Sequence, residues 1–254
     1  MSIRIAIDVM GGDHAPDAVM KGVIDALPLL AQDERLVLVG REDVIRAHLA
    51  ERSVQDPRVE VVHTPDVIEM GDSPAQAVRS KPDSSIVVMA KLGSHKAEIP
   101  CDAVISAGNT GACVAAGQMY MRRLPGVHRP GIAVTIPAFQ GPVVLCDAGA
   151  NPEPRPLHLW QYGLMAEVLA RKTLGIANPR VALMNIGAEE GKGSDLIKGA
   201  RDLFRRTPDV NFIGYIEGRE LFAGAADVVV TDGFTGNSML KMAEGLAKSL
   251  FEAI

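Results

Sequence analysis

The stretch Val-Ile-Ser-Ala-Gly-Asn-Thr-Gly-Ala, residues 104–112, decides the fold class. The apolar run 103–105 predicts the end of a buried strand, and the small apolar residues of 112–121 predict a packed helix. A glycine-bearing turn between a strand and a helix can bind an anion, because glycine lets the backbone approach a ligand and the first helical N–H groups point at it. The alternative is a tight turn whose Asn109 and Thr110 cap the helix.

The composition is that of an ordinary globular chain of 254 residues, with 47% hydrophobic and 22% charged residues. The net charge of −5 and the 4% aromatic content provide no general basic field and few stacking platforms for nucleic acid. No apolar run is as long as a membrane span, so we expect any membrane contact to be peripheral. Cys101, Cys113 and Cys146 are isolated, which predicts reduced thiols in a cytoplasmic protein.

Predicted strands alternate with predicted helices along the chain. The strands are expected at 3–9, 36–40, 59–63, 103–105, 180–186, 210–215 and 228–231, and the helices at 17–30, 42–52, 86–92, 112–121, 156–174, 195–206 and 238–254. This alternation predicts an α/β fold whose sheet is largely parallel and is covered by helices on both faces. The close strands 132–136 and 143–146 predict a hairpin, so we expect a mixed sheet.

Glycines and polar residues recur in the loops that follow predicted strands. Such loops come after Val9, Ile105, Cys146, Ile186 and Thr231. Ligands of α/β sheets bind at the carboxyl ends of the strands, so these loops predict a site rich in backbone N–H groups and neutral donors. No Ser-His-Asp or Cys-His arrangement is evident. This pattern favours a small anion as a reactant over a nucleophile of the protein.

Metal and nucleotide sites are not indicated. The segment 10–16 has two adjacent glycines but lacks the GxGxxG fingerprint, and 187–194 lacks the spacing of a P-loop. Asp8, Asp13 and His14 make a thin set of metal ligands, and a turn residue and a hydrogen-bonded loop histidine are the alternatives for the last two. We therefore expect no metal and no cofactor.

Several motifs resemble the bacterial phosphate acyltransferase (PlsX) family, in that family's order and over essentially the whole chain. They are residues 5–16 (IAIDVMGGDHAP), 104–112 (VISAGNTGA), 129–130 (RP), 147–151 (DAGAN), 185–193 (NIGAEEGKG) and 232–237 (DGFTGN). The resemblance implies transfer of an acyl group from acyl-[acyl-carrier-protein] to inorganic phosphate, giving acyl phosphate for phospholipid synthesis. It also implies a three-layer αβα sandwich similar to isopropylmalate dehydrogenase and phosphotransacetylase.

The resemblance carries further expectations about organisation and partners. It implies a single PlsX-type domain over 1–254 that lacks the family's C-terminal helical hairpin and last sheet segment. It implies a cytoplasmic homodimer associated loosely with the inner face of the cell membrane, where a glycerol-phosphate acyltransferase would take the product. The segment 152–155 departs from the usual continuation in this family.

The expected mechanism is direct attack of phosphate on the thioester carbonyl. Backbone amides of Gly11, Gly12 and the 107–111 loop would hold phosphate, with Asn109 or Lys192 stabilising the oxyanion. Asp13 or His14 would accept a proton. The predicted substrate-binding residues are Asp8, Gly11, Gly12, Ser106, Gly108, Thr110, Gly111, Arg129, Asn151, Asn185, Glu189, Asp232 and Asn237.

Acyl carrier protein is acidic, so a basic patch should dock it, and the candidates are Arg122, Arg123, Arg129, Arg201, Arg205 and Arg206. Other functions stay open. One is a short-chain phosphotransacetylase that uses acyl-coenzyme A, and another is a nicotinamide-dependent dehydrogenase on the same fold. A third is a non-catalytic membrane scaffold for fatty-acid enzymes, which would use the apolar stripe of 238–254.

Overall fold

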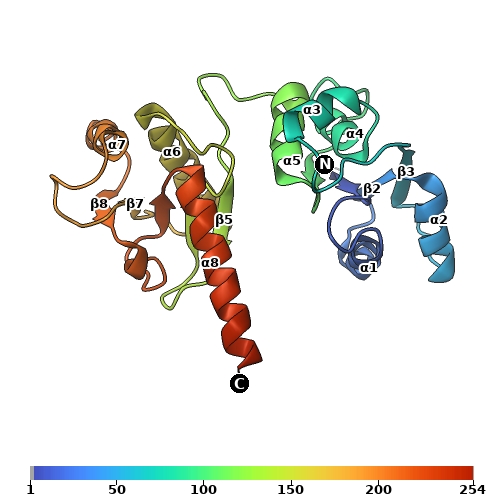
Figure 1. Cartoon of the computed structure of the whole chain (residues 1–254). Coiled ribbons are helices and arrows are strands. Elements are labelled where there is room, and N and C mark those ends of the chain that lie inside the picture. Colours follow the sequence, from blue (N-terminus) through green and yellow to red (C-terminus); the bar gives the residue numbers. More distant parts are fainter. Residues whose placement is uncertain (1–2, 254) are drawn as a thin grey trace. The chain divides into compact units, whose positions relative to one another are not determined.

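The computed structural model describes residues 3–253, which form two compact units with a sheet each (Figure 1). Unit 1 extends to Leu124, and unit 2 begins at Pro125. Parallel strands flanked by helices confirm the predicted α/β class. The division of the strands over two sheets was not predicted, because hydrophobic periodicity identifies strands without telling which of them pair.

Unit 1 contains a wholly parallel sheet in the order β3-β2-β1-β4. Its elements are β1 (Arg4–Asp8), α1 (Asp17–Ala26), η1 (Leu27–Leu29), β2 (Arg35–Gly40), α2 (Glu42–Glu51), β3 (Val59–His63), α3 (Pro74–Ser80), α4 (Ser85–Leu92), β4 (Ala103–Ile105), α5 (Thr110–Ala116) and the π-helical turn η2 (Gly117–Met121). Parallel neighbours place the loops after β1 and β4 at the same edge of the sheet.

Helices cover both faces of the unit 1 sheet. Along β2, Leu36 and Leu38 pack with the residues of α1 and α2, while Val37 and Val39 pack with Met89 of α4 on the opposite face. This alternation follows from the two-residue period of a strand. Unit 1 therefore has three layers, as the sequence predicted.

The end of β4 is not buried, which corrects a prediction made from the apolar run 103–105. Ile105 is 53% exposed. Strand β4 lies at the edge of the sheet and pairs with β1 alone among residues 3–253. An edge strand lacks a second neighbour to cover it, and an apolar run cannot reveal this in the sequence.

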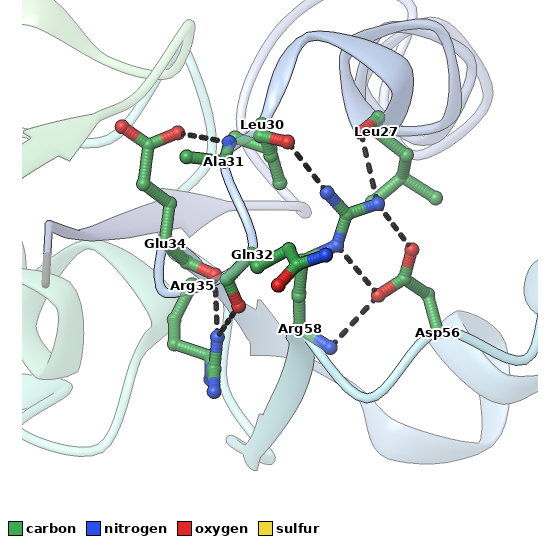
Figure 2. Close-up of polar contacts among 8 residues, drawn as sticks. All are labelled: Leu27, Leu30, Ala31, Gln32, Glu34, Arg35, Asp56 and Arg58. Atoms are coloured by element: carbon green, nitrogen blue, oxygen red, sulfur yellow. Dashed lines mark hydrogen bonds and ion pairs between the residues drawn. The ribbon is translucent and has the colours of Figure 1, made fainter.

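Arg58 joins two segments on one side of unit 1 (Figure 2). Its guanidinium donates to the carbonyls of Leu30 at 2.7 Å and Leu27 at 3.0 Å, and to the Asp56 carboxylate at 2.7 Å. The turn η1 that follows α1 is thereby tied to the segment that leads into β3. The bond to Leu30 satisfies a carbonyl that the helix end leaves without an intrahelical partner.

Unit 2 contains a mixed sheet in the order β5-β6-β9-β7-β8. Its elements are β5 (Ala133–Ile136), β6 (Val143–Cys146), α6 (Pro156–Thr173), β7 (Val181–Met184), α7 (Asp195–Arg205), β8 (Phe212–Ile216), η3 (Gly218–Glu220), β9 (Val228–Val230) and α8 (Gly233–Glu252). Strands β5 and β6 are antiparallel, which confirms the predicted hairpin, and the other pairs are parallel.

The two faces of the unit 2 sheet bury different elements. Val181 and Leu183 of β7 pack with residues of α6 and α7, whereas Ala182 and Met184 pack with the hairpin and the start of α8. Strands β6, β9 and β7 are neighbours, so the loops that follow them lie at one edge of this sheet.

Helix α8 extends beyond the rest of unit 2 (Figure 1), and it carries an apolar stripe that its own unit leaves uncovered. Met242, Leu246 and Leu250 are 71%, 61% and 56% exposed, as the amphipathic pattern of 238–254 predicted. Ile254, the last residue of that stripe, lies outside the described residues. No helix within 3–253 has both the length and the hydropathy that crossing a membrane requires.

Candidate functional site

The predicted site residues form two groups of loops, one in each unit. In unit 1 the loops after β1 and β4 are tied together by two side chains. Ser106 Oγ donates to the Asp8 carboxylate at 2.7 Å and accepts from the N–H of Gly108 at 3.0 Å. Asp8 also accepts from the N–H of Met10 at 3.1 Å and is almost fully buried. Asp8 and Ser106 therefore hold the shape of these loops.

Glycines let the two loops of unit 1 touch. A Cβ on Gly11 would lie 2.9 Å from the Cα of Gly108, and Gly12 adopts a φ of +116° beside Ala107. No side chain fits at such a distance, and a positive φ favours glycine. The adjacent glycines of 10–16 thus serve loop packing and backbone conformation.

Asn109 is the N-cap of α5, which is the alternative the sequence left open. Its Oδ1 accepts from the N–H of Ala112 at 3.0 Å. Its Nδ2 donates to the carbonyls of Glu69, Met70 and Asp72 at 3.1–3.3 Å. Both ends of this buried amide are engaged within unit 1, so it could donate to an oxyanion only after these bonds break. The structure offers no support for that predicted catalytic role.

Other predicted residues of unit 1 are open to solvent. Thr110 and Gly111 are exposed at the start of α5, where the first N–H groups have no intrahelical acceptor. Asp13 and His14 are exposed in the turn between β1 and α1. These groups can meet a ligand without any rearrangement of the core, and their roles stay predictions.

In unit 2 the loop after β6 wraps around a buried carboxylate, that of Asp147. One oxygen accepts from the N–H groups of Ile132, Gly149 and Ala150 at 2.9–3.2 Å, and the other accepts from the N–H of Asn151 at 2.7 Å. Asp147 has no exposed surface. Asp147 was not among the predicted site residues, although its motif DAGAN has the Asp-x-Gly composition of a turn that accepts backbone N–H bonds.

Asn151 links this loop to the segment that carries Arg129. Its Nδ2 donates to the carbonyl of Pro130 at 2.6 Å, and its Oδ1 accepts from the Arg129 guanidinium at 3.3 Å. Asn151 is buried, whereas Arg129 is exposed. The structure thus presents the Arg129 charge at the surface beside the loop after β6.

The loop after β7 is organised by Asn185, whose Nδ2 donates to the carbonyls of Gly187 at 3.0 Å and Lys192 at 3.4 Å. The exposed Lys192 ammonium lies 2.8 Å from the Glu189 carboxylate. This ion pair lets Glu189 orient the Lys192 ammonium. Asn185 acts here as a support of the loop.

The N-terminal turn of α8 packs on the loop after β6. Asp232 caps α8 by accepting from the N–H and the hydroxyl of Thr235 at 2.8 and 2.7 Å. The Cα of Gly236 lies against the carbonyl of Asp147 with no room for a Cβ, and Asn237 lies over Gly149. Two predicted loops of unit 2 therefore come together, with Asn237 exposed and Asp232 engaged as a cap.

The predicted basic face of α7 is partly neutralised. Arg201 lies 2.8 Å from Asp202, and Arg205 pairs with Glu190. The six arginines predicted to dock a carrier protein also divide between units, since Arg122 and Arg123 belong to unit 1 and the others to unit 2. No group of three or more His, Cys, Asp or Glu side chains that could hold a metal occurs within 3–253.

The fold places the chain among α/β proteins similar to phosphotransacetylases. It resembles EutD phosphotransacetylase from Staphylococcus aureus with a TM-score of 0.61 and 17% identity, covering 97% of this chain and 83% of that one. It resembles a branched-chain phosphotransacylase from Enterococcus faecalis V583 with a TM-score of 0.55 and 17% identity, covering 94% and 83%. At such identities the likeness concerns the fold alone.

The sequence comparisons are more specific. The family model described as "Fatty acid synthesis protein" matches residues 3–254, and the chain belongs to this family. Proteins named phosphate acyltransferase are similar to it in Heliobacterium modesticaldum (46% identity, 98% of this chain, 72% of the relative), Geobacillus sp. (48%, 99% and 74%) and Bacillus subtilis (45%, 98% and 73%). The chain is thus an acyltransferase of the phosphate acyltransferase family.

Proposed function

We propose that this protein transfers a long-chain acyl group from acyl-[acyl-carrier-protein] to inorganic phosphate, giving acyl phosphate for phospholipid synthesis. The observation that carries the proposal is the 45–48% identity, over nearly the whole chain, to relatives named phosphate acyltransferase. The family's link to fatty acid synthesis supports a lipid acyl group as the cargo.

In unit 1 we assign phosphate to the loops after β1 and β4. These loops are fixed by the bond between Ser106 and Asp8, and they expose Thr110 and Gly111 at the start of α5. Rigid loops that present backbone N–H groups suit an anion, since the donors need no reorganisation when it binds. The hydroxyl of Thr110 adds a neutral donor.

Phosphate itself is the proposed nucleophile. One of its oxygens attacks the thioester carbonyl, a C–O bond forms, the C–S bond breaks and the carrier leaves as the thiolate. Phosphate is already largely ionised at neutral pH, so Asp13 or His14 would be a minor aid as base. In unit 2, the exposed ammonium of Lys192 is a candidate for stabilising the oxyanion.

The cysteines support attack by phosphate over an acyl-enzyme route. Burial raises the pKa of the Cys113 thiol above its usual value, and the nearby Asp8 charge raises it further. Burial also raises the pKa of the Cys146 thiol strongly. Thiols with raised pKa values stay protonated at neutral pH and are poor nucleophiles.

Acyl carrier protein is the proposed donor partner, and a homodimer at the inner membrane face is the proposed setting. Arg129 and Arg206 are exposed cations of unit 2 that could meet an acidic carrier. The exposed Met242, Leu246 and Leu250 of α8 support contact of this helix with an apolar partner surface. A membrane glycerol-phosphate acyltransferase would consume the acyl phosphate.

The test compares two acyl donors at equal concentration, palmitoyl-[acyl-carrier-protein] and acetyl-coenzyme A, with and without inorganic phosphate. Hydroxylamine traps acyl phosphate as a hydroxamate that can be measured. We expect phosphate-dependent hydroxamate from the palmitoyl donor. If only acetyl-coenzyme A gives product, the protein is a short-chain phosphotransacetylase and the proposal is wrong. If neither donor gives product, the scaffold function is favoured.

A further inference from the structure

A basic cluster lies at the start of α6 and consists of Arg129, Arg155, His128 and His158. We call it the α6 cluster. The rings of His128 and His158 have centroids 6.3 Å apart, and the backbone N–H of Arg155 donates to His158 Nδ1 at 3.1 Å. Burial lowers the pKa of His158, and the charges of Arg129, His128 and Arg155 lower it further, so all three charges act on His158.

The backbone that carries Arg129 is fixed from two sides. Gln161, on the first half of α6, accepts from the N–H of His128 at 2.9 Å and donates to the carbonyl of Gly126 at 2.7 Å. On the other side, Asn151 donates to the carbonyl of Pro130 at 2.6 Å. The backbone of the Arg129 segment is therefore held beside the first half of α6.

The two guanidinium groups of the α6 cluster have no acidic partner. Among residues 3–253, no Asp or Glu oxygen lies within ion-pair distance of Arg129 or Arg155. The nearby Asp147 is buried and its oxygens are bonded to backbone N–H groups. Glu153 is exposed and forms no ion pair within that part of the chain. The cluster thus has positive charge available for an anion.

His158 adds a neutral donor to this charge. It is 8% exposed, and its Nδ1 accepts a hydrogen bond, so the ring proton must lie on Nε2. Within 3–253, His158 forms no hydrogen bond through Nε2. A phosphate oxygen is an acceptor that would pair with this N–H, and two guanidinium groups match its charge and its several oxygens.

We propose that the α6 cluster binds a phosphate group, with Arg129, Arg155 and His158 Nε2 as its donors. The positive end of the α6 dipole adds to the attraction, since the helix is 18 residues long. The inference rests on the proposed function for the source of the group. That source is either inorganic phosphate or the phosphate ester on the pantetheine arm that carries the thioester.

Equilibrium binding tests the proposal without turnover. Three probes, inorganic phosphate, 4′-phosphopantetheine and pantetheine, are titrated by calorimetry into the wild-type chain, Arg155→Gln and Arg155→Lys. The control is Arg171→Gln in the last turn of the same helix, where Arg171 pairs with Glu167. Arg155 is the exposed N-cap of α6 and Arg171 an exposed residue of its last turn, so their loss affects the net charge equally.

We expect Arg155→Gln to lower the affinity for a phosphate-bearing probe about ten-fold. The affinity should recover partly in Arg155→Lys and should be unchanged in Arg171→Gln. Weaker binding of 4′-phosphopantetheine alone assigns the cluster to the donor arm, and weaker binding of inorganic phosphate assigns it to the substrate phosphate in place of the unit 1 loops. Equal affinity of wild type and Arg155→Gln for all three probes would overturn the proposal. If the protein binds these probes through Arg155 but makes no acyl phosphate, the binding site stands and the proposed reaction is wrong.

Discussion

Ser106 Oγ donates to the Asp8 carboxylate at 2.7 Å and thereby joins the loops after β4 and β1. Ser106→Ala removes this donor and leaves a buried carboxylate with one bond fewer. We expect a loss of about 1–3 kcal/mol in the free energy of unfolding, measured by urea denaturation. Ser249→Ala, on the exposed side of α8, is the matched control and should change that free energy by less than about 0.5 kcal/mol. Equal unfolding midpoints for wild type and Ser106→Ala would show that the bond contributes nothing.

Replacing two glycines of α8 by alanine should change the stability of unit 2 in opposite directions. At Gly236 a Cβ would collide with the Asp147 carbonyl, which is backbone and cannot rotate away. At Gly245 a Cβ would meet nothing within 4 Å. We expect Gly236→Ala to destabilise unit 2 by about 1–3 kcal/mol and Gly245→Ala to stabilise it by about 0.5–1 kcal/mol. Thermal unfolding checks both, and a tolerated Gly236→Ala would contradict the packing of α8 on the loop after β6.

Asn109→Ala should lower stability as well as turnover. The sequence alone predicted lower turnover with the fold intact. The structure shows that the substitution removes the N-cap of α5 and three bonds to the 69–72 segment. We expect a loss of about 1–2 kcal/mol from the cap alone. Urea denaturation and turnover below the melting temperature separate the two effects, and full stability in Asn109→Ala would contradict the structural role.

The Asp56 contact with Arg58 should make stability depend on pH (Figure 2). The side-chain bond from Arg58 lowers the pKa of Asp56 from 3.8 to about 2, with help from the Arg58 N–H. A lowered carboxyl pKa adds stability that is complete above the unfolded value and is lost as the pH falls through the folded one. The stability difference between wild type and Asp56→Asn should therefore shrink from about pH 5 to about pH 2.

The control for this pH series is Asp83→Asn, since the Asp83 carboxylate is mostly exposed and lies 3.9 Å from Lys91. It should change stability little at any pH. A difference between wild type and Asp56→Asn that stays constant down to pH 2 would contradict the lowered pKa.

Local structure could be predicted well from the sequence. Strand β3 has the predicted bounds 59–63, and the β5–β6 hairpin follows from two short apolar runs around a Pro-rich turn. Pairing could not be predicted, because the apolar pattern of β4 is the same for an edge strand and a central one. Val168 of α6 is exposed although it is apolar, which shows the same limit, since helical spacing does not fix the width of the buried face.

The candidate site could be predicted as a set of loops but not as a set of roles. The Gly-Asn-Thr-Gly turn and the Asp-Ala-Gly-Ala-Asn loop do lie at strand ends. Sequence cannot show which way a polar side chain points. It did not reveal that Asn109, predicted to stabilise the oxyanion, and Asn185 and Asp232, predicted to bind substrate, form bonds that support the loops. Arg155 and His158 were missed because each is an ordinary helix-start residue until the Arg129 segment is placed beside it.

The central claim is that phosphate, and no residue of the protein, attacks the thioester. The most direct measurement is a single-turnover experiment that mixes excess protein with palmitoyl-[acyl-carrier-protein], follows free carrier, and determines the protein's mass. Without phosphate we expect no carrier release and no mass increase, and with phosphate we expect carrier release together with acyl phosphate. A stoichiometric burst of carrier without phosphate, together with an acyl group on the protein, would contradict the account.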